Sequence, residues 1–216
     1  MGIDYASLLR SMLEASGTTL AIFGLTLLFG LPLGLVAAAG RMSRFKPLRW
    51  LVTIYLQIMR GTPLMLQLFF FCYGPYYIFH VSGTSRFTAA IVAFTLNYAA
   101  YFAEIYRAGI ESIPVGQYEA AGALGFTRGQ TFFRIVLPQV IKRILPPMGN
   151  EFMTLVKDTS LARVIAIVEL FTIAEKTSSN FFSTIPLVIA GVFYFVMNAA
   201  VGKCFAVAEK KLDYYR

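Results

Sequence analysis

The chain has 216 residues, of which 57% are hydrophobic and 14% are charged, and its formal net charge at pH 7 is +8. A soluble domain carries about 25% charged residues, so this composition excludes an ordinary soluble protein and favours one that a lipid bilayer solvates. We attribute the surplus of lysine and arginine to membrane topology and lipid-headgroup contacts rather than to nucleic-acid binding.

Five apolar segments, taken in chain order, are predicted to cross the membrane. A spanning helix needs about 20 mostly apolar residues, and a helix satisfies its own backbone hydrogen bonds in lipid. The first segment is too long for the apolar core of a cleaved signal peptide. No alternating barrel pattern is present, so the predicted fold class is all-α integral membrane. The segments are residues 17–40, 61–79, 87–103, 135–156 and 181–202.

The connection after the first segment determines the predicted orientation, because basic residues accumulate on the cytoplasmic side of a membrane. It contains Arg41, Arg44, Lys46 and Arg49. Placing it in the cytoplasm also places there the basic connection after the third segment and the basic C-terminal tail. We therefore expect the N-terminus outside and the C-terminus in the cytoplasm.

Residue patterns of catalytic or metal chemistry are missing from the sequence. Cys72 and Cys204 lie in separate apolar segments, and His80 is the single histidine. The sequence has no Walker-type glycine loop, no Gly-x-Ser-x-Gly elbow and no acidic cluster at metal spacing. We expect no catalytic site, no metal and no cofactor in this chain.

The connection over residues 107–134 is predicted to contain a short cytoplasmic helix. Pro114 marks its start, residues 115–124 include good helix formers, and glycines limit it to a few turns. So short a helix cannot bury itself, and we expect its partly apolar face to fit a groove on another protein. That face carries Tyr118, Ala121, Leu124 and Phe126.

This connection resembles the cytoplasmic loop signature of the permease subunits of ABC importers. The matching residues are Glu119-Ala120-Ala121, Gly125, Ile135 and Leu137-Pro138. Four further motifs extend the resemblance to the polar amino acid uptake branch, over roughly residues 15–210. They are Arg60-Gly61-Thr62-Pro63-Leu64 before Gln67, Ala103-Glu104-Ile105 with Arg107, Gly109-Ile110-Glu111-Ser112-Ile113-Pro114 before Gly116-Gln117, and Lys157-Asp158-Thr159-Ser160-Leu161 before Glu169-Leu170.

The resemblance implies a type I permease fold, with residues 1–216 forming a single transmembrane domain of the cell inner membrane. It implies a dimer with a second permease subunit, either a copy of this chain or a close paralogue. It also implies two copies of a separate ABC ATPase subunit, which binds the ATP, and a solute-binding protein outside that delivers a polar amino acid.

In this family picture, a coupling loop over about residues 110–134 docks into a cleft of the ATPase subunit. Tyr118, Glu119, Ala120 and Ala121 would form the contact, and Gly125 would permit the tight turn after it. Closure of the ATPase would then push on the helix and swing the spans from inward-facing to outward-facing.

Ionisable residues at membrane depth are the candidates for the substrate site. Glu104 lies one turn from Arg107, so it either pairs with Arg107 or Arg60 or lines the pathway. Glu151 follows Pro146-Pro147, and prolines loosen backbone hydrogen bonding as in the discontinuous helices of transporter sites.

A second group of candidates precedes residues 161–174, which are too few to span a membrane. We expect a re-entrant or interfacial helix over about residues 160–175, with Asp158, Thr159 and Ser160 at its N-cap. The free N–H groups there could bind an amino acid's carboxylate, while Glu151 or Asp158 holds its ammonium. Asn97 and Tyr98 would complete the pocket, and the three acids Glu104, Glu151 and Asp158 favour a basic amino acid such as arginine, lysine or histidine.

Two other protein classes compete with this interpretation. A secondary transporter driven by an ion gradient should show an inverted repeat, into which five spans do not divide. A lipid-modifying membrane enzyme needs a nucleophile, metal ligands or an acid and base pair. Glu151 with Asp158 is the one candidate pair, and no histidine accompanies it.

Overall fold

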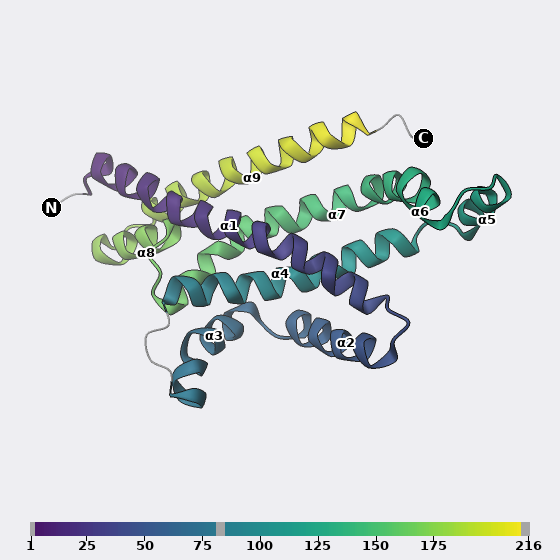
Figure 1. The fold of residues 1–216 in the computed structure, drawn as a ribbon. Helices are drawn as coiled ribbons and strands as arrows, with labels where there is room; N and C mark the ends of the chain where they lie inside the picture. Colours follow the sequence, from purple (N-terminus) through teal and green to yellow (C-terminus); the bar gives the residue numbers. More distant parts are fainter. Residues whose placement is uncertain (1–2, 81–84, 213–216) are drawn as a thin grey trace.

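The computed structural model describes residues 3–80 and 85–212, and every regular element in that part of the chain is helical (Figure 1). The 3₁₀ and π segments are labelled η. The elements are α1 (Tyr5–Arg41), α2 (Lys46–Gly61), α3 (Leu64–Phe79), α4 (Arg86–Glu111), α5 (Val115–Ala123), α6 (Arg128–Thr131), η1 (Phe132–Val136), α7 (Leu137–Asp158), η2 (Thr159–Ile165), α8 (Leu170–Phe181) and α9 (Ile185–Lys211).

The five predicted segments correspond in order to α1, α3, α4, α7 and α9. Among the described residues, α1, α4 and α9 are the helices long and apolar enough to cross a membrane. Helix α3 is apolar but has 16 residues, and α7 has 22 residues with several charges among them. The all-helical class is confirmed, whereas the count of five spans stays a prediction.

Helix α4 is the central helix of the fold. Figure 1 shows α1 crossing α4 and α7 running beside it, while α9 lies on the far side of α7; the inter-helix contacts agree. The side chains of Phe94, Tyr98 and Phe102 on α4 are buried, and they share one core with Ile22 of α1 and Leu155 of α7.

Helices α1 and α4 approach closely because α1 presents glycines at the contact. A β-carbon at Gly34 would lie 2.8 Å from Phe102 Cβ and 3.1 Å from the Ala99 carbonyl oxygen, so no larger residue fits there without movement. Gly30 also faces α4, whereas Gly24 has no neighbour within 4 Å of an added β-carbon. Close packing of α1 on α4 therefore involves Gly30 and Gly34 and not Gly24.

The two ends of the molecule differ in what they carry. Figure 1 shows α5 at one end, together with the C-terminal ends of α1 and α9 and the start of α2. The N-terminal end of α1 and helix α8 lie at the opposite end. The basic connection between α1 and α2 thus shares an end with α5.

The region predicted as one helix over about residues 160–175 is divided in two. The 3₁₀ segment η2 ends at Ala166, whose φ of 60° is left-handed, and α8 begins only after Glu169. Glu169 caps α8, because its carboxylate accepts hydrogen bonds from the backbone N–H groups of Phe171 and Thr172. Of the three residues predicted at the N-cap, Asp158 does stand at the N-cap position of η2, but its side chain makes no capping hydrogen bond there.

The prolines that were expected to loosen the backbone before Glu151 do not break α7. The helix runs through Pro146 and Pro147 to Asp158. The irregular turn lies earlier, in the π-helical η1 just before Pro138, which has no backbone N–H to donate. Together α6, η1 and α7 form one uninterrupted helical rod.

Candidate functional site

A pocket of about 430 Å³ lies between α4 and α7 and is lined by two of the three acids predicted to face the substrate, Glu104 and Glu151, but not by Asp158. This volume is within the range of small-molecule sites. Its polar lining includes Arg60 from the last turn of α2, Tyr101 and Glu104 from α4, and Arg143 and Glu151 from α7. The pocket therefore brings together side chains from three helices.

Glu104 is neutralised within its own helix. Arg107 donates hydrogen bonds from Nε and from a terminal nitrogen to the two carboxylate oxygens, both at 2.9 Å. Arg60 adds an ion pair at 3.6 Å from the other side. Both predicted partners of Glu104 are thus present, and little of its charge remains for a ligand.

Glu151 has the opposite environment. It is half-buried in the same pocket, and it makes no hydrogen bond or ion pair with any residue of the described ranges 3–80 and 85–212. Asp158 lies seven residues further along α7, hence on nearly the same face, and accepts a hydrogen bond from the hydroxyl of Tyr98 at 2.7 Å. The structure thus brings Tyr98 and Asp158, two candidates for the substrate pocket, into direct contact.

Asn97 holds the backbone around Arg60 in place. Its amide nitrogen donates to the Met59 carbonyl oxygen at 2.9 Å and to Gln67 Oε1 at 3.0 Å. Gln67 in turn donates to Met59 O at 3.0 Å and to Thr62 Oγ1 at 2.8 Å. Asn97 is buried, and these hydrogen bonds connect α4 to the α2–α3 junction. Its amide is therefore engaged by the protein itself.

Thr159 and Ser160 are engaged locally. Their hydroxyls donate to the carbonyl oxygens of Val156 and Lys157, each at 2.7 Å. Thr159 is fully buried. Neither caps a helix, so the free N–H groups that were expected to bind a carboxylate are not offered at this position.

Helix α5 ends in a Schellman motif at Gly125. The φ of this glycine is +80°, the Phe126 N–H donates to the Ala121 carbonyl at 3.0 Å, and the Gly125 N–H donates to the Gly122 carbonyl at 3.0 Å. The predicted tight turn at Gly125 is confirmed. A residue with a side chain would be strained at this φ, whereas glycine adopts it readily.

The candidate coupling residues of α5 divide into exposed and buried ones. Tyr118, Glu119 and Ala120 are exposed, and so is Leu124 at the end of the helix, at 75%. Ala121 is buried, which differs from its expected place on the contact face. Its small size lets α5 lie against the chain behind it, where α5 contacts α6 and η1.

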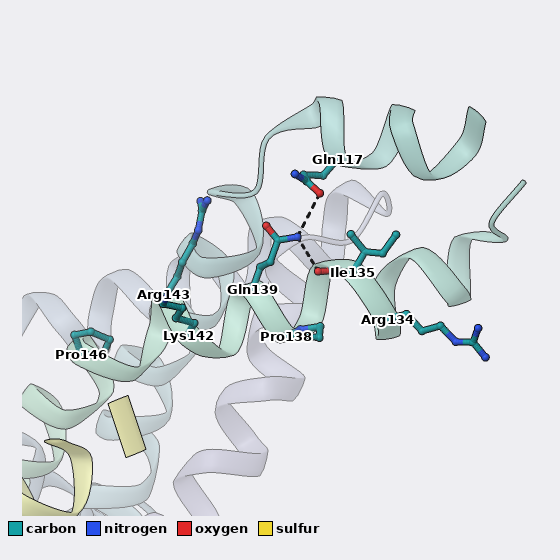
Figure 2. Close-up of a pocket in the computed structure, with 8 residues that line it drawn as sticks. All are labelled: Gln117, Arg134, Ile135, Pro138, Gln139, Lys142, Arg143 and Pro146. Carbon is teal, nitrogen blue, oxygen red and sulfur yellow. Dashed lines mark hydrogen bonds between the residues drawn. The ribbon is translucent and has the colours of Figure 1, made fainter. Parts of the chain in front are cut away.

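A second pocket, of about 710 Å³, lies between Gln117 of α5 and residues of η1 and α7 (Figure 2). Gln139 of α7 spans this gap, because its amide nitrogen donates to the Ile135 carbonyl oxygen at 2.8 Å and to Gln117 Oε1 at 3.4 Å. Figure 2 shows Arg134 and Arg143 pointing away from this contact in different directions. The two glutamines therefore join α5 directly to α7.

Sequence reasoning named Arg60 only as a partner of Glu104, and it missed Gln67 and Gln139 as positioning residues. Gln67 stands in a recognised motif, but its partner Asn97 on α4 is 30 residues away in the chain. Gln139 directly follows Pro138, and a polar residue beside a proline was the available signal.

Comparison with known proteins gives consistent matches along almost the whole chain. The model of the family described as "binding-protein-dependent transport system inner membrane component" matches residues 30–213. The L-cystine transport system permease protein TcyB of Bacillus subtilis (strain 168) is 39% identical over 201 residues, which is 91% of this chain and 84% of that protein. The arginine transport system permease protein ArtQ of the same organism is 35% identical over 216 residues, 98% of each.

The fold has a solved counterpart. A crystal structure of an amino acid ABC transporter with histidines contains a chain that superimposes with a TM-score of 0.86 at 33% sequence identity. The match covers 98% of this chain and 100% of that chain.

Proposed function

This chain belongs to the family of binding-protein-dependent transport system inner membrane components, and we propose from that premise that it carries a basic amino acid past Glu151 and Asp158. It is a permease subunit of an amino acid ABC importer. Such a subunit is not itself an enzyme, and a separate subunit hydrolyses the ATP. Arginine, lysine or histidine is the proposed substrate.

The environment of the acids in the pocket supports a cationic substrate. Arg107 neutralises Glu104, whereas Glu151 and Asp158 form no ion pair within the described part of the chain. A carboxylate at membrane depth is costly without a partner, so an incoming cation lowers the free energy of the site. The named substrates of the relatives, cystine for TcyB and arginine for ArtQ, differ, so the proposal of a basic substrate rests on the local charge and not on the relatives.

We further propose the membrane topology expected from the sequence. Helices α1, α3, α4, α7 and α9 cross the inner membrane, with the N-terminus outside and the C-terminus in the cytoplasm. The basic α1–α2 connection and the basic end of α9 support this orientation, because both lie at the end of the molecule that carries α5 (Figure 1).

In the assembly that we propose, α5 is the coupling helix. Tyr118, Glu119 and Ala120 contact one of two ATPase subunits, and the turn at Gly125 directs the chain back into the rod. A second permease subunit, identical or closely related, completes the pathway. A solute-binding protein delivers the amino acid from outside.

Uptake by the reconstituted complex tests the substrate site. The complex of this chain with its ATPase and binding protein, in liposomes, should import labelled arginine or lysine only with ATP. Glu151→Gln and Asp158→Asn should each weaken arginine binding by about tenfold or more, since each removes a charged hydrogen-bond partner. Glu14→Gln is the matched control, because Glu14 is an exposed carboxylate on α1 that pairs with Arg10.

Two outcomes would contradict this proposal. Unchanged arginine affinity in both site variants would remove Glu151 and Asp158 from the site. Uptake that needs an ion gradient and no ATP would instead favour a secondary transporter.

A glycine substitution tests the coupling helix. Gly125→Asp should leave the complex assembled but separate ATP hydrolysis from uptake, because any side chain strains the left-handed turn that directs the chain out of α5, and aspartate adds a charge beside the proposed contact. Gly129→Asp is the control, since Gly129 lies in α6 with open space around it and no left-handed φ. Measuring transported amino acid per ATP hydrolysed checks the effect; full coupling in Gly125→Asp would exclude the docking role.

A further inference from the structure

Arg60 is a cation within the pocket that holds Glu151. Its ion pair with Glu104 Oε1 is 3.6 Å long, and its guanidinium carbon lies 5.5 Å from the centre of the Tyr101 ring. The side chain is 41% exposed, which leaves its donors accessible from the pocket. Arg60 is therefore placed to meet a ligand there.

The ion pair with Glu104 does not use the N–H donors of Arg60 in a hydrogen bond. A separation of 3.6 Å is too long for a hydrogen bond, and Arg107 already provides Glu104 with two hydrogen bonds at 2.9 Å. Arg60 donates no hydrogen bond to any side chain or carbonyl in the described residues. Its planar set of N–H donors, which suits a carboxylate, is available.

The backbone beneath Arg60 is fixed even though its guanidinium is accessible. The carbonyl of the preceding residue, Met59, accepts hydrogen bonds from Asn97 and from Gln67, which join it to α4 and α3. A side chain anchored at its base and open at its tip is pre-organised for binding. Asn97 thus positions the cation and does not contact the ligand itself.

Arg143 is the other arginine of the pocket, and it is already engaged. Its guanidinium donates to the backbone carbonyl of Ser112 and, at 3.0 Å, to the hydroxyl of the same residue. It therefore holds α7 to the end of α4. Arg60 remains the pocket's better partner for an anionic group.

We infer that Arg60 binds the carboxylate of the transported amino acid while Glu151 binds its ammonium group. The inference rests on the proposed function and adds the recognition of the carboxylate, for which no free helix N-terminus exists at Asp158. For a basic amino acid the charges then match: two acids, Glu151 and Asp158, face two cationic groups, and Arg60 faces the carboxylate. A ligand without the carboxylate loses this contact.

Paired ligands test the inference in the complete complex with its ATPase subunits. Equilibrium binding of L-arginine is compared with that of agmatine, which is arginine without its carboxylate, for the wild type, Arg60→Gln and Arg60→Lys. Arg60→Gln should weaken L-arginine binding by about 10-fold to 100-fold, since a charged hydrogen-bonded contact is lost. Agmatine binding should stay equal or tighten, because a like charge is removed. Arg60→Lys should fall between, as it keeps the charge without the planar fork.

Each remaining outcome overturns something specific. Equal weakening of both ligands by Arg60→Gln would assign Arg60 a structural role and overturn the inference. Unchanged L-arginine binding in Arg60→Gln, with loss in Glu151→Gln, would overturn the inference and leave the proposed site intact. A wild-type complex that binds no amino acid at all would overturn both.

Discussion

Glu169 is a fully buried carboxylate that no cation neutralises within residues 3–80 and 85–212. Four donors stabilise it instead: the N–H groups of Phe171 and Thr172 and the Thr172 hydroxyl, each at 2.8 Å, and the Tyr194 hydroxyl at 3.0 Å. The hydroxyl of Thr19 on α1 accepts from the next backbone N–H, at 3.3 Å. Glu169 thus joins the start of α8 to α9 through Tyr194. The neighbouring N–H of Leu170 joins the start of α8 to α1 through Thr19.

Removing this carboxylate should destabilise the fold. Glu169→Ala leaves four donors without their acceptor and should lower the free energy of unfolding by about 3 kcal/mol. Tyr194→Phe removes a single donor and should cost about 1 kcal/mol. Thermal unfolding in mild detergent measures both, and a Glu169→Ala variant as stable as the wild type would refute the anchoring role.

Among single residues, sequence reasoning predicted the contacts of Glu104 but missed most contacts between residues that are far apart in the chain. The pairing of Glu104 with Arg107 follows from a three-residue spacing on one helix. Asn97, by contrast, was assigned to the ligand because its partner Met59, which lies 38 residues earlier, could not be identified from spacing. Tyr98 and Asp158 were each named as pocket candidates, but the hydrogen bond between them spans 60 residues and was not predicted.

Among the elements, hydrophobic pattern predicted which segments are helical and did not predict where they end. Helix α1 begins at Tyr5, well before the apolar run, because Asp4 caps it by accepting from the Ala6 N–H at 3.1 Å. Helix α4 continues to Glu111 because Arg107 pairs with Glu104 and Glu111. The break between η2 and α8 was missed, because both segments are apolar and only the buried position of Glu169 decides where capping occurs.

The close contact between α1 and α4 should depend on the absence of a side chain at Gly34. Gly34→Leu should separate the two helices, since even a β-carbon would lie 2.8 Å from Phe102 Cβ. Gly24→Leu makes the same change in the same helix where nothing lies within 4 Å, and it should be tolerated. Yield of monodisperse protein in detergent and its unfolding temperature are the readouts. Equal behaviour of the two variants would show that close packing at Gly34 is dispensable.

The whole molecule has two dissimilar ends joined by long helices (Figure 1). One end carries α5 and the basic α1–α2 connection, and the other carries α8 and the start of α1. An asymmetric distribution of lysine and arginine orients membrane proteins during insertion. The arrangement of the ends therefore makes the topology testable with one residue at each.

Labelling of single cysteines tests the topology. In a Cys72→Ala, Cys204→Ala background, Ser183→Cys between α8 and α9 should react with a membrane-impermeant maleimide on intact cells. Ser43→Cys between α1 and α2 should react only after permeabilisation. Ser43 and Ser183 are both half-buried, so a difference in labelling between the two cysteines would report the side of the membrane and not burial within the protein. The reverse labelling pattern would invert the proposed orientation.

The uninterrupted rod from α6 to Asp158 would act as a lever about the hydrogen bond from Tyr98 to Asp158 if it moved against α4. At 1.5 Å per residue, Arg128 lies about 45 Å along the rod from Asp158 and Glu151 about 10 Å from it. A displacement of about 4 Å at the loop would then reach Glu151 as about 1 Å, a step on the scale that makes or breaks a well-aligned contact. Such a movement would have to release the contact of Arg143 with Ser112, and it would change the distance between Glu151 and Arg60, whose backbone is joined to α4.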